Sequence, residues 1–241
     1  MEIKEALASP DAAFNSPQCR LSTIMQLSDS GFPTGGFSHS CGYEAAYRLG
    51  HVKNVKQMKD FLMGILENAG SQSLPVLRAA YDCSDDLVRV AEVDRFCDVS
   101  LNNHVAKKAS VQQGKSILST ASETFPQNGI KVLKNAVKEG SLIGHQAVVF
   151  GCLCSYLNIS LNDTAEIFLF NQLRTVVAST VRLGNIGPLE AQRVQFELQQ
   201  LIPEIITRFI DVSLEDSCIT FPLVDLFQNC HDTLFSKMFY S

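Results

Sequence analysis

Apolar residues recur at intervals of three and four along most of this 241-residue chain, and that spacing restricts the possible folds more than any other feature. One such run follows Asn54, a suitable helix N-cap. Two others cover residues 169–183 and 198–212, and we expect Pro203 to kink or restart the second of these helices. No stretch of five or more residues alternates cleanly between apolar and polar, as a half-buried strand would. We therefore predict an all-α, single-domain bundle of about nine or ten helices.

The outline of the domain follows from where large apolar residues begin and where turn residues interrupt them. Residues 1–19 contain Pro10, Pro17 and few large apolar side chains, so we expect a flexible N-terminal arm before a helical domain at 20–241. No linker-like stretch divides that domain. Helix breaks are expected at residues 31–36, 50, 70–75, 125–129, 140–144, 158–163, 184–188 and 216–222.

Charge and hydropathy exclude two classes of partner. With 20 basic and 25 acidic residues the net charge is −5, which gives no basic footprint for nucleic acid. The longest nearly apolar stretch, Ala147–Leu157, is about half of the roughly 20 residues that a membrane-spanning helix needs. Because the first residues also lack a signal-peptide core, we expect a cytoplasmic protein whose eight cysteines are free thiols.

Motifs for catalysis are incomplete. Gly114-Lys115-Ser116 resembles the end of a phosphate-binding loop, but Ala109 stands where that motif needs its first glycine. Ser38 and Ser40 flank His39 without the Gly-x-Ser-x-Gly turn of a nucleophile. We therefore expect no enzymatic activity, no catalytic residues and no cofactor of the chain's own.

Two pairs of close-set metal-ligand residues also occur. They are His39 with Cys41, and Cys152 with Cys154. Side chains two residues apart on a helix point about 200° away from one another, so neither pair can hold one ion while helical. The apolar neighbours of Cys152 and Cys154 favour packing in the core. These pairs predict no metal site.

The unusual stretch is Leu27–Ala46, LSDSGFPTGGFSHSCGYEAA. We expect a helix to end at residues 28–30 and a turn to follow, in which glycines let the backbone approach another surface closely. A second helix is predicted next, with Ser40 and Glu44 on one face and His39 and Tyr43 on another. Gly42 on that helix would allow close packing against a neighbour.

This stretch closely resembles the N-terminal signature of the urease accessory protein F (UreF) family, the nickel-insertion factor. Residues 181–192 are similar to the family's R-L-G-x-I-G-P-x-x-A-Q turn, where Gly184 suits a left-handed helix end and Pro188 the first turn of the next helix. The end of the chain resembles the family's ending in Pro222, Asp225, His231, Leu234, Phe235 and Ser241. Weaker landmarks are Ser110, Gly114, His145 and Phe150-Gly151, so the resemblance covers about residues 20–241.

The resemblance implies an all-α protein without catalysis of its own. It would pair with itself and with a second accessory protein, of D or H type, and the assembly would recruit the accessory GTPase G. Nickel would be handled by the assembled complex and passed towards apo-urease, while GTP and Mg would be bound by the GTPase. The alternative is a nickel-binding metallochaperone that holds the metal through its own histidines and cysteines. Cys41 stands where many relatives have another residue, which counts against a metal role for His39 and Cys41.

The resemblance also marks the residues expected to bind partners or to form the signature. They are Asp29, Ser30, Pro33, Gly35, Gly36, His39, Gly42, Glu44, Arg182, Gly184, Gly187, Pro188, Asp225 and His231. Asp29, His39 and Glu44 either face a partner or satisfy local backbone donors. Arg182 either caps the last helical carbonyls or pairs with a buried carboxylate. The segment 221–241 is too apolar to stay solvated, so we expect it to be ordered by the D/H-type partner or by the chain's own core.

Overall fold

The computed structural model describes residues 17–241, with side chains from Arg20 onward. Most of the predicted N-terminal arm, residues 1–16, lies outside the described residues. Residues 17–19, which were assigned to the arm, form the first turn of a helix instead. Pro17 suits that position because its fixed φ and missing N–H are tolerated at a helix start.

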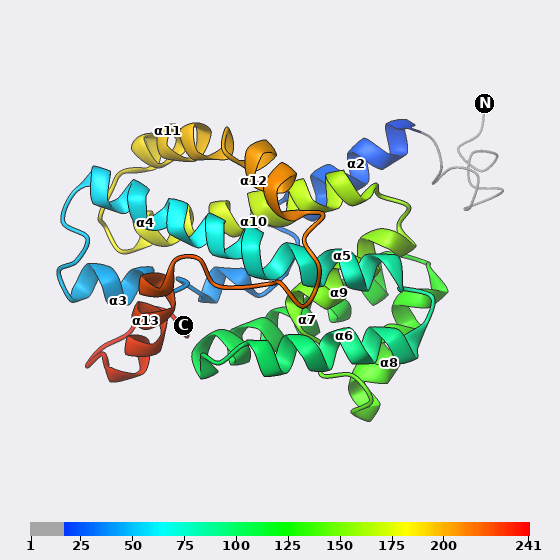
Figure 1. Ribbon diagram of the computed structural model, residues 1–241. Helices are drawn as coiled ribbons and strands as arrows, with labels where there is room; N and C mark the ends of the chain where they lie inside the picture. Colours follow the sequence, from blue (N-terminus) through cyan, green and yellow to red (C-terminus); the bar gives the residue numbers. More distant parts are fainter. Residues whose placement is uncertain (1–16) are drawn as a thin grey trace.

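Helices make up the architecture, and no strand occurs within residues 17–241. Ten helices have nine or more residues: α2 (Pro17–Ser28), α4 (Val55–Asn68), α5 (Leu74–Asp82), α6 (Leu87–Ser100), α7 (His104–Thr124), α8 (Asn128–Glu139), α9 (Gln146–Tyr156), α10 (Leu161–Arg182), α11 (Pro188–Gln199) and α13 (Pro222–Cys230). Two are shorter, α3 (Tyr43–Arg48) and α12 (Ile202–Phe209). The predicted all-α bundle is confirmed (Figure 1).

Helix α9 forms the centre of one half of the bundle, with α5 and α7 packed on it. Every residue from Ala147 to Cys154 is buried, so this helix is apolar all round, as expected for one enclosed by others. A Cβ at Gly151 would clash with the Leu77 carbonyl of α5, and one at Gly114 of α7 would clash with the Gly144 carbonyl. Two of the weaker landmarks are therefore points where backbones pack closely.

The chain does not break between α4 and α5, contrary to the break predicted at residues 70–75. A π-helical turn, Ala69–Ser73, joins the two helices into one continuous rod. Gly70 allows α12 to pack closely over this turn, because a Cβ at this position would clash with Ile205 and Phe209. Pro75 is tolerated because it lies in the first turn of α5.

The other half of the bundle is built on α10, the longest helix, against which α4, α11 and α12 pack. Pro203 lies in the first turn of α12, so the helical pattern at 198–212 is interrupted and restarts, one of the two outcomes expected. Asn54 caps α4 as predicted, its side chain accepting from the Gln57 N–H at 2.9 Å. No helix of the described part is long and apolar enough to cross a bilayer.

The cysteines whose side chains are described are all free thiols: Cys41, Cys83, Cys97, Cys152, Cys154, Cys218 and Cys230. Cys152 and Cys154 are fully buried in the core, which confirms that they pack as small apolar side chains.

Candidate functional site

The first part of the site is a glycine-rich hairpin, residues 29–42, that lies against α7. The Asp29 carboxylate accepts the Gly31 N–H at 2.7 Å, so this side chain satisfies a local backbone donor. The Pro33 carbonyl accepts hydrogen bonds from Ser116 (3.1 Å) and Thr120 (2.9 Å) of α7. Gly35 has φ +76°, a conformation that favours glycine, and this shapes the hairpin to the helix surface.

The second helix of the hairpin begins later than predicted. Gly36–Ser38 forms a 3₁₀ turn, residues 39–42 are not helical, and α3 begins only at Tyr43. The expected continuous helix with His39 and Ser40 on its faces is therefore wrong, although the Ser40 hydroxyl still contacts α3 by accepting the Glu44 N–H at 3.3 Å. Two residues in the left-handed region interrupt the helix here, Cys41 with φ +51° and Gly42 with φ +83°. Gly42 also lets α13 pack closely against the hairpin, because a Cβ at this position would lie only 2.8 Å from the Gln228 backbone nitrogen.

The end of the chain binds to this hairpin. The Ser241 carbonyl accepts hydrogen bonds from the Ser40 N–H at 2.6 Å and from the Ser40 hydroxyl at 2.9 Å. The Tyr240 N–H donates to the Ser38 carbonyl at 2.8 Å. His39 Nδ1 lies 2.5 Å from the Ser241 hydroxyl. Two segments that resemble the UreF family, about 200 positions apart in sequence, are thus joined by hydrogen bonds.

Glu44 forms the most extensive contact between α3 and the tail. Its carboxylate is fully buried and accepts the Met238 N–H at 2.8 Å and the Phe239 N–H at 3.1 Å. Arg48 donates to the same carboxylate at 2.8 Å. Because every one of these bonds is assisted by charge, the buried carboxylate is well compensated. Glu44 therefore binds the backbone of the chain's own tail, rather than backbone donors of its own segment.

Two buried histidines complete the contact. His231 Nε2 donates to the Phe239 carbonyl at 3.0 Å and holds the tail from the side of α13. Burial, together with the nearby His231, lowers the pKa of His39 to about 4. His39 is therefore neutral at physiological pH.

Arg182, at the end of α10, contacts both the hairpin and the tail. Its guanidinium donates to the Phe37 carbonyl and lies 3.8 Å from the centre of the Phe37 ring and 4.3 Å from that of Phe239. This side chain neither caps α10 nor forms a direct ion pair within the described residues, and the buried Glu44 carboxylate acts on it only at longer range. It links the hairpin to the tail through cation–π contacts.

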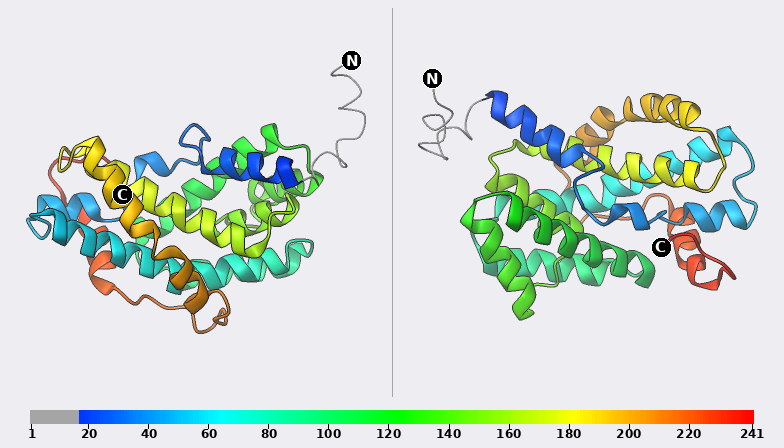
Figure 2. Two further views of the ribbon diagram at one scale, coloured as in Figure 1. Left: turned by 90° about the horizontal axis from the view of Figure 1, so that it is seen from above. Right: turned by 180° about the vertical axis from the view of Figure 1, so that it is seen from behind.

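The turn after Arg182 has the form that was predicted. Gly184 has φ +71°, as a left-handed helix end requires, and Pro188 follows Gly187 in the first turn of α11. Asn185 donates to the Tyr43 hydroxyl of α3. We call the meeting of residues 37–44, 182–185 and 238–241 the hairpin–tail junction; Figures 1 and 2 show it near the C mark.

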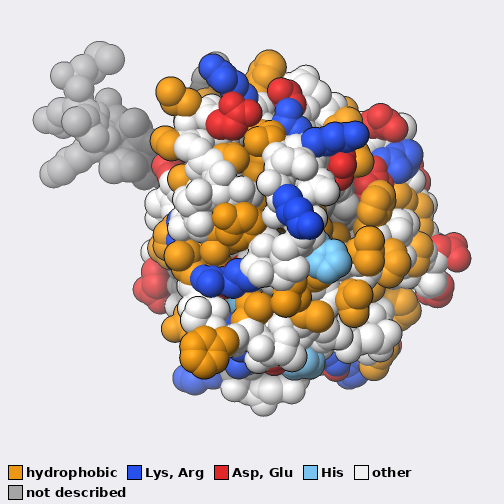
Figure 3. Space-filling model, turned by 90° about the vertical axis from the view of Figure 1, so that its left-hand side faces the viewer, with side chains coloured by type: hydrophobic (Ala, Val, Ile, Leu, Met, Phe, Trp, Pro, Cys, Tyr) orange, Lys and Arg blue, Asp and Glu red, His pale blue; other side chains and the backbone are white. Residues whose placement is uncertain are grey.

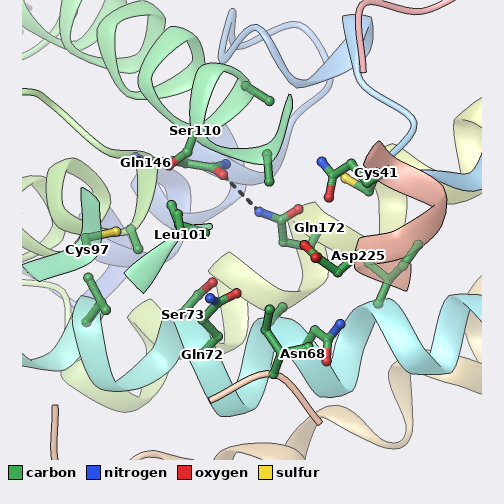
Figure 4. A pocket seen from close by; sticks show the side chains of 18 of the residues that line it. Cys41, Asn68, Gln72, Ser73, Cys97, Leu101, Ser110, Gln146, Gln172 and Asp225 are labelled. Carbon is green, nitrogen blue, oxygen red and sulfur yellow. Dashed lines mark hydrogen bonds between the residues drawn. The ribbon is translucent and has the colours of Figure 1, made fainter. Parts of the chain in front are cut away.

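Asp225 lies on α13, behind the junction. Its carbonyl and its carboxylate accept from the Asn103 side chain at 2.9 and 3.0 Å, which ties α13 to the start of α7. Asp225 also lines a partly open cavity of about 140 Å³, together with Cys41, apolar side chains and amide side chains (Figure 4). Gln72 and Ser73 reach this cavity from the π-helical turn, and Gln146 and Gln172 are hydrogen-bonded across it at 3.0 Å.

The cysteines proposed as alternative nickel ligands lie in unfavourable surroundings for a metal. Burial raises the pKa of the Cys41 thiol to about 11 and that of Cys154 to about 12, so neither is a thiolate at neutral pH. Within residues 20–241 no group of three or more His, Cys, Asp or Glu side chains could hold a metal ion.

The outer side of the junction is apolar. Phe37 is 69% exposed, Tyr240 is 81% exposed and Phe235 is fully exposed. Leu223 and Leu226 add exposed side chains from α13. Figure 3 shows hydrophobic side chains gathered on the end of the molecule where α3, α11 and α13 lie.

Comparison with known proteins identifies the family. The UreF family model matches residues 52–199, more than half of the chain. The chain belongs to the UreF family. A urease accessory protein F from Oryza sativa subsp. indica is 32% identical over 240 residues, covering 99% of this chain and 90% of that protein. The Arabidopsis thaliana protein of the same name is 31% identical over 218 residues, covering 90% of each chain.

Bacterial members are similar over the same length. A urease accessory protein UreF from Trichodesmium erythraeum is 27% identical over 219 residues, covering 90% of this chain and 94% of that protein. A urease accessory role therefore follows from the family. The family-model match contains the turn at 182–188 but neither the hairpin nor α13, whereas the alignment with the rice protein covers nearly the whole chain.

Three residues of the junction were not found from the sequence, Phe37, Asn185 and Phe239, and neither was the neighbouring Arg48. The spacing of Glu44 and Arg48, four residues apart on a helix, was a usable signal for their ion pair. The other three contact segments more than 140 positions away, and no local pattern predicts such contacts.

Proposed function

We propose that this protein is a non-catalytic scaffold for urease maturation in the cytoplasm. It would form a homodimer, bind a D/H-type accessory protein and recruit the accessory GTPase G, so that the assembly inserts nickel into apo-urease. The observation that carries the proposal is the hairpin–tail junction. Its buried polar groups are occupied in holding the tail, while its outer side exposes Phe37, Phe235 and Tyr240, as a protein-binding surface does.

The surroundings of the incomplete phosphate-binding motif support this division of labour. Gly114-Lys115-Ser116 lies inside α7, where Gly114 packs against the Gly144 carbonyl and Ser116 binds the Pro33 carbonyl. A phosphate-binding loop needs free backbone N–H groups, which a continuous helix does not provide. GTP and Mg are therefore assigned to the GTPase partner.

Urease activation by glycine variants tests the proposal. Replacing Gly35 or Gly36 by valine crowds the hairpin against α7 and α10, since a Cβ lies 3.3 Å from Ser116 at Gly35 and 3.3 Å from Thr175 at Gly36, and Gly35 also has φ +76°. We expect folded variants to activate urease less in a reconstituted system, with GTP hydrolysis by the isolated GTPase unchanged. Folding is checked first by melting. Wild-type activation by both folded variants would refute the role of the hairpin in assembly.

A direct nickel measurement separates the scaffold from the metallochaperone alternative. We expect equilibrium dialysis of the isolated chain to show no stoichiometric nickel binding, because the buried thiols are protonated. One tightly bound nickel per chain that disappears in His39→Ala or Cys41→Ser would support the alternative instead.

A further inference from the structure

A second feature lies beside the junction, on the surface of α10. Arg174, Ala178 and Arg182 follow one another at intervals of four residues and so form one stripe along that helix. The small Ala178 leaves a hollow between the two arginines, and the hairpin forms its other wall with Ser30 and Thr34. The pocket has a volume of about 260 Å³, and the exposed Phe37 ring lies at its edge. We call it the arginine pocket.

Neither guanidinium in this pocket forms an ion pair with a described side chain, although Asp29 acts on Arg174 and Glu44 acts on Arg182 over a longer distance. Among the described side chains no carboxylate lies within 4.0 Å of Arg174 or Arg182, whereas Arg48, Arg78, Arg193 and Arg208 all form ion pairs. Each of the two donates one hydrogen bond, to the Ser28 and Phe37 carbonyls respectively. A guanidinium carries five N–H donors, so most of them are left for another acceptor.

The two acids nearest to the pocket are already used. The Asp29 carboxylate accepts from Gly31 and Ser30, and that of Glu44 accepts from the tail and Arg48. Both arginines are half-buried, and this burial lowers the pKa of each guanidinium. A half-buried positive charge whose nearby carboxylates lie beyond ion-pair distance gains free energy when an anion binds it directly.

We infer that the arginine pocket binds an acidic segment of a protein partner, with one carboxylate at Arg174 and another at Arg182. The two Cα positions are eight residues apart on a helix, about 12 Å, and their guanidiniums bind two different carbonyls, those of Ser28 and Phe37. A segment with two acidic side chains matches this separation, and Phe37 offers an apolar contact beside it. The inference rests on the proposed function, because the partner belongs to the maturation complex.

Binding measurements with the full-length chain test this inference. The D/H-type protein is titrated with the wild-type chain or a variant, and the resulting complex is then titrated with the GTPase, at about 50 and 300 mM salt. We expect Arg174→Gln and Arg182→Gln each to raise Kd about tenfold, either for the D/H-type protein or for the GTPase. Arg174→Lys keeps the charge and is expected to recover most of that loss. The double variant should also show a weaker dependence of Kd on salt.

Arg193→Gln is the matched control. Arg193 lies on α11, is mostly exposed and pairs only with Glu190, so its Kd values are expected to equal those of the wild type. Melting curves establish that each variant is folded. If folded Arg174→Gln and Arg182→Gln bind as the wild type does, with the same salt dependence, the inference is wrong while the scaffold proposal stands. If the wild-type chain binds neither protein, both fail.

Discussion

At the scale of single residues, the tail depends on buried polar side chains that lie far from it in sequence. Glu44 contributes the largest number of these contacts, with two main-chain amides of the tail and the Arg48 guanidinium on one carboxylate. Replacing a buried carboxylate that accepts several hydrogen bonds lowers the stability of the fold, because its buried donors are left without an acceptor.

We predict that Glu44→Gln loosens the tail. The substituted amide loses the negative charge and keeps a single acceptor oxygen, so either the Met238 or the Phe239 N–H faces an NH2 group, and we expect a loss of about 2 kcal/mol in the free energy of unfolding. Chemical denaturation measures the loss, and limited proteolysis shows whether the tail is cleaved first. Glu190→Gln, on the surface of α11, is the control and should change stability by less than about 0.5 kcal/mol. Equal effects of the two substitutions would contradict this account of Glu44.

His39 predicts a dependence of stability on pH. Its pKa is about 4 in the folded chain and about 6.5 in the unfolded chain, so the unfolded state takes up a proton first as the pH falls. Stability is therefore lost between pH 6.5 and 4, by up to about 3 kcal/mol. Denaturation at several pH values, compared with His39→Gln, isolates this contribution. The same pH profile in both proteins would exclude His39 as its source.

At the scale of elements, regular helices were predictable and their junctions were not. Helix α4 has both a periodic apolar face and the Asn54 cap, so local signals defined it. The expected break at Gly70 was wrong because that glycine serves the packing of α12, a neighbour that no local pattern reveals. The resemblance marked the hairpin, the turn and the tail, yet the contact between Glu44 and residue 238 could not be derived from any of them alone.

Three glycines allow the two roles of glycine to be separated. Gly42 has a positive φ and is also crowded by α13; Gly184 has a positive φ but no neighbour within 4 Å; Gly187 has neither constraint. We predict that alanine costs about 1 kcal/mol at Gly184, more at Gly42, and less than about 0.5 kcal/mol at Gly187. Melting temperatures of the three variants check this order. A Gly42→Ala variant as stable as Gly187→Ala would contradict the close approach of α13 to the hairpin.

At the scale of the whole molecule, the exposed apolar side chains lead us to expect a homodimer. Phe196 and Leu189 lie seven residues apart on α11 and are both largely exposed, which leaves apolar surface for another chain. Sedimentation should show a dimer at high micromolar concentration. A strictly monomeric species, with or without the D/H-type partner, would count against it.

The tail is expected to matter to assembly because it covers the hairpin. Deleting residues 221–241 removes α13 and exposes the buried junction, so we expect loss of partner binding or of solubility. A soluble truncated chain that still forms the full complex would contradict this role of the tail.

The mass of the complex formed on co-expression with the D/H-type protein and the GTPase tests the scaffold most directly. Light scattering after size exclusion should give one species whose mass contains all three proteins, with two copies of this chain at its centre. If this chain elutes alone while its candidate partners are folded and present in excess, it is not the scaffold proposed here.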